Sequence, residues 1–294
     1  MADSSCRIEA LTASDGYRWQ YRHYPAAMEP RAAVVCLHGI QSHGGWYESS
    51  CGQLAQAGFD VYFLDRRGSG LNQQDRGDTP SFRRLLDDVA EFLIALGGCA
   101  NAPVRDRRLN VFLVGISWGG KLAAALQRRH PGLVDGMALL CPGFCSRVRP
   151  ALGHRLAILW SRLIAPRHQF PIPLDDPELF TATPRWQQFL RDDPLSLRQA
   201  TARFLIESVR LDGYLHFVPR YVRVPVLLML AEHDRIIDNA GARRFVESFA
   251  AMEKKVVEYP GAHHTLEFEP EPEVFVRDLL GWLDNRAGLP VIRR

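Results

Sequence analysis

The sequence LVGISWGGKLAAAL, residues 113–126, joins an apolar run to an alanine-rich run through a glycine-flanked serine. The apolar residues before Ser117 predict a buried strand, and the alanine-rich residues after it predict a helix. Residues 115–119 match G-x-S-x-G, a motif that requires a strand before it and a helix after it. Its three fixed letters occur by chance about once in ten chains of this length. The motif alone is therefore weak evidence, and the predicted strand before it and helix after it give it weight.

A serine in a sharp strand-to-helix turn adopts strained backbone geometry, and its hydroxyl projects into open space. Gly115 and Gly119 avoid clashes between this turn and the neighbouring backbone. The turn also places Ser117 at a helix N-terminus, where unpaired N–H groups favour a developing negative charge. Ser117 is therefore a candidate nucleophile, and the alternative is a serine that only caps the helix.

Short apolar runs alternate with helical patterns on both sides of this turn, which is typical of a parallel sheet covered by helices. We expect strands at 32–39, 60–65, 110–117, 136–143, 224–234 and 254–261, and helices at 46–58, 81–98, 118–132, 239–252 and 271–286. Residues 7–25 are expected to add an antiparallel hairpin at one sheet edge. Residues 144–220 break the alternation with helical, proline-containing sequence, which predicts a cap inserted between core segments 1–143 and 221–294.

Composition limits the classes of protein. The chain has 294 residues, 47% of them hydrophobic and 23% charged, which fits one large α/β domain with an insertion. A net charge of +3 gives little electrostatic reason to expect a nucleic-acid partner. The N-terminal residues show no apolar signal segment, and no apolar run has the length of a membrane span, so we expect a cytoplasmic protein. The oligomeric state is not predictable from these features.

A serine hydroxyl needs a base, usually an imidazole that is oriented by an acid. Because the carboxyl ends of parallel strands gather at one sheet edge, residues that follow late strands can reach Ser117. Asp234 ends the expected strand 224–234, and His263 and His264 follow strand 254–261. These residues give the chain order serine, acid, histidine.

Several motifs together resemble the α/β-hydrolase superfamily, specifically its monoacylglycerol lipase, lysophospholipase and serine aminopeptidase-like branch. They are GISWGG (115–120), LHGIQSHGGWY (37–47), DRRGSG (65–70), DDPL (192–195), AEHDRIID (231–238) and YPGAHHTLEFE (259–269). The resemblance covers nearly the whole chain. It implies an α/β-hydrolase fold, with a mostly parallel eight-stranded sheet flanked by helices and an inserted helical cap.

The resemblance also ranks the candidate partners of Ser117. The family places its histidine as G-x-x-H, which selects His264 over His263, and its register favours Asp234 as the acid. Asp238 is the second candidate acid. Glu232 is two residues before Asp234 and is expected to point away along the strand.

An oxyanion hole supplies two N–H donors to the developing negative charge. The general pattern assigns one donor to Trp118, the residue after the nucleophile. The resemblance assigns the other to Ile40, with Gly39 allowing close backbone approach and His38 bracing the loop. His43, Tyr47 and His263 also match positions that are structural or line the substrate pocket in the family, and we carry them with Gly39 as candidate substrate-binding residues.

These features predict a serine hydrolase of carboxylic esters, acting through an acyl-enzyme without a metal or organic cofactor. The expected substrates are monoacylglycerols, lysophospholipids or similar small lipid esters. A peptidase, amidase or thioesterase on the same scaffold is the alternative, and a non-catalytic hydrolase-like protein that binds an apolar ligand is another.

The expected cap holds two apolar helical segments. In the first, Leu152, Leu156, Leu159 and Leu163 share one face with Trp160 close by. That face either packs into the core or forms a lid that makes transient contact with a membrane surface. The second segment, 195–211, is expected to pack the cap onto the core.

Acidic residues of the cap also have two interpretations. They could bind a substrate ammonium group, as an aminopeptidase requires, or they are solvated loop charge, which is the more common case. The residues are Asp175, Asp176, Glu178, Asp192 and Asp193.

Overall fold

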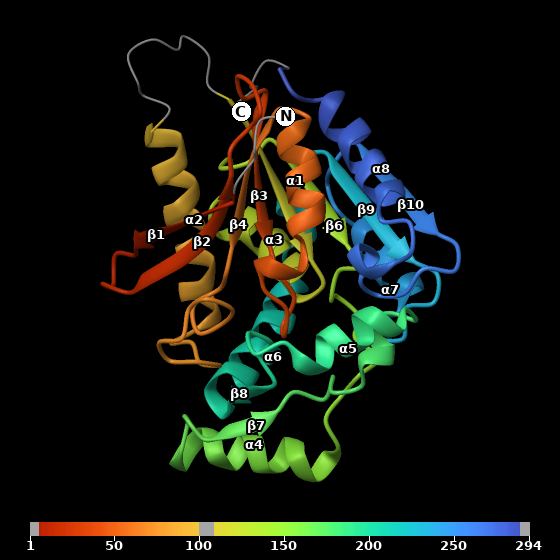
Figure 1. Cartoon of the computed structure of the whole chain (residues 1–294). Helices are drawn as coiled ribbons and strands as arrows, with labels where there is room; N and C mark the ends of the chain where they lie inside the picture. Colours follow the sequence, from red (N-terminus) through yellow and green to blue (C-terminus); the bar gives the residue numbers. More distant parts are fainter. Residues whose placement is uncertain (1–5, 100–108, 289–294) are drawn as a thin grey trace.

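The computed structural model of the chain describes residues 6–99 and 109–288. Its centre is an eight-stranded sheet with the strand order β1-β2-β4-β3-β5-β6-β9-β10 (Figure 1). The strands are β1 (Arg7–Thr12), β2 (Arg18–Tyr24), β3 (Ala32–Leu37), β4 (Phe59–Leu64), β5 (Asn110–Ile116), β6 (Gly136–Leu140), β9 (Val226–Ala231) and β10 (Lys254–Tyr259). β2 pairs antiparallel with β1 and β4, and the other neighbours are parallel. The expected parallel sheet and edge hairpin are confirmed.

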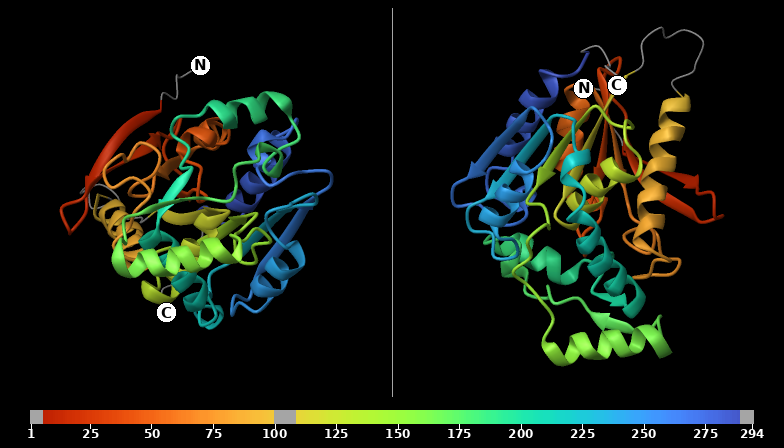
Figure 2. Two further views of the ribbon diagram at one scale, coloured as in Figure 1. Left: turned by 90° about the horizontal axis from the view of Figure 1, so that it is seen from below. Right: turned by 180° about the vertical axis from the view of Figure 1, so that it is seen from behind.

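Helices cover both faces of the sheet. α1 (Glu48–Gln56) and α8 (Glu273–Asp284) pack together on one face, and α2 (Phe82–Cys99) and α3 (Trp118–Arg129) on the other (Figures 1 and 2). α7 (Asn239–Glu247) packs against β9 and β10. The central strands are buried along their whole length, which explains their unbroken apolar sequence. In the described part of the chain, no helix combines the length and apolar character that crossing a membrane requires.

The segment between β6 and β9 forms a layer over one end of the sheet. It contains α4 (Leu152–Ile164), β7 (Gln169–Pro171), α5 (Pro184–Asp192), β8 (Gln199–Thr201) and α6 (Ala202–Leu215). The predicted helix at 195–211 is wrong in its first part, because β8 pairs antiparallel with β7. Thr201 then caps α6 by accepting a hydrogen bond from the Phe204 N–H. Inter-strand pairing thus replaces helix in a segment too short to show a clear period.

The apolar face of α4 does not pack into the core. α4 is the outermost element of this layer (Figures 1 and 2). Trp160 is 63% exposed and Leu163 is 77% exposed, and Leu152, Leu156 and Leu159 are exposed as well. Ile158 is the one buried residue of α4. The core-packing interpretation of this face is therefore wrong.

Glu267 ties the loop that follows β10 to the first turn of α1. Its Oε1 accepts a hydrogen bond of 3.0 Å from the N–H of Ser50, the third residue of that helix. Burial raises the pKa of the Glu267 carboxyl to about 7, from an ordinary value of 4.5. Between these two pH values the folded chain holds a proton that the unfolded chain releases, so stability falls as the pH rises through this window.

We expect Glu267→Gln to stabilise the protein at pH 8 by up to about 3 kcal/mol, and by much less at pH 5. The amide keeps an acceptor for the Ser50 N–H and removes the buried charge. Urea unfolding at both pH values measures the effect, and the exposed Glu271→Gln is the control. An equal effect of Glu267→Gln at the two pH values would contradict this account.

Candidate active site

Ser117 lies in the tight turn between β5 and α3 with φ 50° and ψ −120°. Two glycines make this turn fit. A Cβ on Gly119 would lie 2.3 Å from the Leu37 carbonyl oxygen, and one on Gly115 would lie 2.8 Å from the Gly120 Cα. Ser117 is partly exposed, whereas the residues on both sides of it are buried. The turn therefore leaves the Ser117 side chain partly accessible between two buried neighbours.

His264 and Asp234 complete a hydrogen-bonded chain with this serine. His264 Nε2 is 2.9 Å from Ser117 Oγ, and its Nδ1 is 2.7 Å from Asp234 Oδ2. The other Asp234 oxygen accepts the N–H groups of Ile236 and Ile237, each at 2.8 Å. Asp234 and His264 are both buried. Such an imidazole can accept the serine proton while the carboxylate fixes the ring orientation.

The alternative candidates for the base and the acid, His263, Asp238 and Glu232, have other partners. The backbone N–H of His263 donates to Glu269, and its ring Nδ1 is 3.3 Å from the same carboxylate. Asp238 faces Arg147 at 3.6 Å. Glu232 is exposed and accepts a backbone N–H from the turn after β10. The structure thus brings His264 and Asp234 together with Ser117.

Two unpaired N–H groups lie close to the serine. A Cβ on Gly39 would come within 3.3 Å of Ser117 Cβ, so the loop after β3 runs directly past this side chain. The Gly39 N–H donates to Ser42 Oγ. Within the described residues, the N–H groups of Ile40 and Trp118 have no protein acceptor. Both donors are free to bind an oxyanion.

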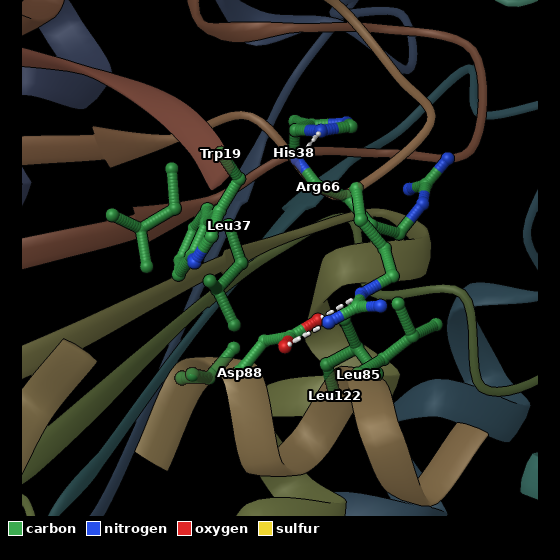
Figure 3. A pocket seen from close by; sticks show the side chains of 10 residues that line it. Trp19, Leu37, His38, Arg66, Leu85, Asp88 and Leu122 are labelled. Carbon is green, nitrogen blue, oxygen red and sulfur yellow. Dashed lines mark hydrogen bonds and ion pairs between the residues drawn. The ribbon is translucent and has the colours of Figure 1, made fainter. Parts of the chain in front are cut away.

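His38 braces this loop from behind. The Arg66 N–H donates to His38 Nε2 at 2.8 Å (Figure 3), so the proton lies on Nδ1. Nδ1 donates to the Gly39 carbonyl at 2.7 Å. Burial lowers the pKa of His38 well below its usual value, which keeps the ring neutral. Trp19, His38 and Arg66 line a cavity of about 20 Å³. It has the size of about one water molecule, so it is not an acyl pocket.

His43 and Tyr47 are held within the protein. His43 Nδ1 accepts the Gly45 N–H, and its Nε2 lies 2.9 Å from Asp193. Tyr47 is buried and stacks on Phe63. Their roles as substrate-binding residues stay predictions.

Asp193 was expected to be solvated loop charge, and for this residue the expectation is wrong. It is buried, and its Oδ2 also accepts hydrogen bonds from Trp46 Nε1 and Ser196 Oγ. These donors, with His43, hold the pKa of Asp193 below its usual range. The other acidic residues considered, Asp175, Asp176, Glu178 and Asp192, are exposed. The available signal was the DDPL motif, which is part of the family resemblance. In the structure its second aspartate bonds to His43 of the loop after β3.

One group of side chains in the described ranges has the spacing of a metal site. The ligand atoms of Cys141, Asp234 and His264 lie within 4.8 Å of one another. However, Asp234 and His264 are already bonded to each other, and burial raises the pKa of the Cys141 thiol well above its usual value. A protonated thiol is a poor metal ligand, so the triad geometry explains the grouping.

A larger open cavity of about 680 Å³ lies beside the triad. It is lined by cap residues such as Thr181 and Gln187 and by residues of the loops after β9 and β10, including His233, Asp234 and His263. His263 thus faces this cavity rather than Ser117. Its predicted part in substrate binding stays a prediction.

A family model described as Serine aminopeptidase, S33 matches residues 28–271. A monoacylglycerol lipase of Mycolicibacterium smegmatis is 28% identical over 290 residues, which cover 95% of this chain and 98% of that relative. Lysophospholipase L2 of Escherichia coli K12 is 26% identical, with 89% and 82% covered. The solved structure of Paleococcus ferrophilus monoacylglycerol lipase has a TM-score of 0.79 at 24% identity and covers 94% of this chain and 99% of its own.

These comparisons confirm the predicted α/β-hydrolase fold and the predicted branch of the superfamily. The family match extends from residue 28, before β3, to residue 271, beyond the loop that carries His264. It therefore includes the elements that carry Ser117, Asp234, His264, Ile40 and Trp118. The chain belongs to the serine aminopeptidase S33 family of α/β-hydrolases and is a hydrolase of the esterase and lipase type.

Proposed function

We propose that the chain cleaves carboxylic esters with Ser117 as nucleophile, His264 as general base and Asp234 as the orienting acid. The hydrogen-bonded chain from Ser117 Oγ through His264 to Asp234 carries this proposal. The free N–H groups of Ile40 and Trp118 support it, since an acyl-transfer site needs donors for the oxyanion.

The proposed reaction has two halves. Ser117 Oγ attacks the ester carbonyl while His264 Nε2 takes its proton, and negative charge develops on the former carbonyl oxygen beside Ile40 and Trp118. His264 then gives the proton to the leaving alcohol, which departs from an acyl-serine. Water, activated by the same imidazole, attacks the acyl group and regenerates the free serine.

We propose small lipid esters, such as monoacylglycerols or lysophospholipids, as the substrates. The names of the relatives support this class, and the exposed apolar face of α4 fits a substrate delivered from a lipid surface. Asp193 is occupied by His43, Trp46 and Ser196, so it is not free to bind an amino terminus. In this proposal residues 144–220 form the cap over core segments 1–143 and 221–294.

Ser117→Ala is expected to abolish turnover of p-nitrophenyl esters while the protein remains folded. The change removes the nucleophile and adds no bulk to the turn. Initial rates for a chain-length series of esters measure the effect, and circular dichroism verifies the fold. Ester hydrolysis by the variant at the wild-type rate would defeat the assignment.

Adjacent histidines allow a matched test of the base. We expect His264→Ala to lower kcat by roughly 10⁴-fold or more. His263→Ala is expected to leave kcat within about threefold of wild type, because its ring lies beside Glu269, with Nδ1 3.3 Å from that carboxylate, whereas the ring that bonds to Ser117 Oγ is that of His264. Steady-state kinetics on one short ester compares the two variants, and the opposite ranking would show that the base is misassigned.

We also propose that α4 makes transient contact with a lipid surface. Its exposed leucines and Trp160 form an apolar strip, and the exposed Arg149 and Arg155 lie on or beside the same helix. An amphipathic helix with tryptophan and basic residues binds the interface of an anionic membrane. The cytoplasmic location predicted from the sequence stays a prediction.

Trp160→Asp should weaken association with vesicles of phosphatidylcholine and phosphatidylglycerol by about tenfold or more, because an apolar anchor becomes a charge. Met252→Asp is the control, since Met252 is 98% exposed but lies outside the cap. Vesicle flotation measures both variants. Absence of association in the wild-type protein, or equal loss in the two variants, would refute the contact.

A further inference from the structure

Arg66 follows β4, and its guanidinium is buried against the loop that carries the Ile40 N–H. Nη1 donates to the Gly39 carbonyl at 3.2 Å, and Nη2 donates to the Ile40 carbonyl at 3.0 Å. The side chain therefore binds two successive peptide groups of this loop. Arg66 belongs to the DRRGSG motif, from which no part in the site was predicted.

The first of these bonds sets the direction of an oxyanion donor. The Gly39 carbonyl and the Ile40 N–H belong to one trans peptide, so they point in opposite directions. The same carbonyl accepts the His38 Nδ1–H at 2.7 Å. Two donors on one oxygen hold the plane of this peptide and polarise its N–H.

The same guanidinium also contacts the residue of the second donor. Its Cζ lies 4.9 Å from the centre of the Trp118 ring and 5.1 Å from that of Phe204. Arg66 has no carboxylate within ion-pair distance in the described ranges. Burial lowers the pKa of Arg66 to about 9, which leaves it protonated at neutral pH.

A buried cation without a carboxylate partner is costly unless other contacts hold it. Here two carbonyl oxygens and two aromatic faces hold it, and all except Phe204 belong to the residues of the oxyanion hole. The guanidinium lies at the carbonyl end of the Gly39–Ile40 peptide, and a positive charge there favours negative charge that develops at the N–H end.

We propose that Arg66 is a positioning residue that orients both N–H donors of the oxyanion hole and supplies positive charge behind it. This inference rests on the proposed ester hydrolysis at Ser117. In this proposal Arg66 stabilises the transition state and does not contribute to binding of the substrate in the ground state.

The test compares wild type, Arg66→Gln and Arg66→Lys on a short p-nitrophenyl ester and on the matched thionoester, in which sulfur replaces the carbonyl oxygen. Arg66→Gln is expected to lower kcat for the ester by about tenfold to a hundredfold, with KM within about threefold. The loss for the thionoester should be smaller, because sulfur accepts hydrogen bonds weakly. Arg66→Lys keeps the charge but not the paired bonds, so its kcat for the ester should lie between those of wild type and Arg66→Gln.

Arg76→Gln is the matched control. Arg76 is partly buried and also donates to two successive carbonyl oxygens, those of Leu195 and Ser196, away from the hole. The kcat of Arg76→Gln is expected to stay near that of wild type. Thermal unfolding checks that every variant folds.

Equal losses on the two substrates, or an unchanged kcat in both Arg66 variants, would overturn the inference while leaving the hydrolase intact. If Arg66→Gln does not fold, the same comparison is made with Arg66→Lys. A larger loss of kcat on the ester than on the thionoester supports the inference, and equal losses overturn it. A wild-type chain that hydrolyses neither substrate would instead defeat the proposed function, and this inference with it.

Discussion

The backbone conformation of Ser117 is the constraint on which the site depends. A non-glycine residue at φ 50° and ψ −120° costs about 1–3 kcal/mol in local strain, and the surrounding fold must enforce it. The strand–helix crossing does so by bringing α3 against β3 so closely that only hydrogen fits at Gly119. The Gly120 and Gly143 N–H groups both donate to the Ser117 carbonyl and lock the turn.

The rest of the site is organised around that fixed point by buried polar contacts. The loop after β3 is held from behind by His38 and Arg66, and the loop after β10 is anchored to α1 through Glu267. The layer over the sheet is joined to the loop after β3 through the bond between Asp193 and His43, and to the first residue of α3 through the bond from the Trp118 indole to Ser208. Rigid supports of this kind let free N–H groups remain directed at one point without reorganisation.

Sequence reasoning identified the strands, most of the helices and the turn at Ser117, because each follows from a local pattern of apolar residues and glycines. The choice of His264 over His263 was not available from spacing alone, and it depended on the family resemblance. Features that depend on residues distant in the sequence could not be predicted. β8 forms only because β7 lies opposite it, and the burial of Asp193 depends on partners about 150 positions earlier. The exposure of α4 also could not be predicted, since an amphipathic period does not state what covers the apolar face.

The most direct test of the central claim is chemical labelling of the native protein with a fluorophosphonate, followed by peptide mapping. An activated serine reacts with such a probe, and unactivated serines do not. The account predicts one adduct, on the peptide that contains Ser117, and no adduct once the protein is denatured before labelling. An unlabelled Ser117 in folded protein, or labelling that survives denaturation, would contradict it.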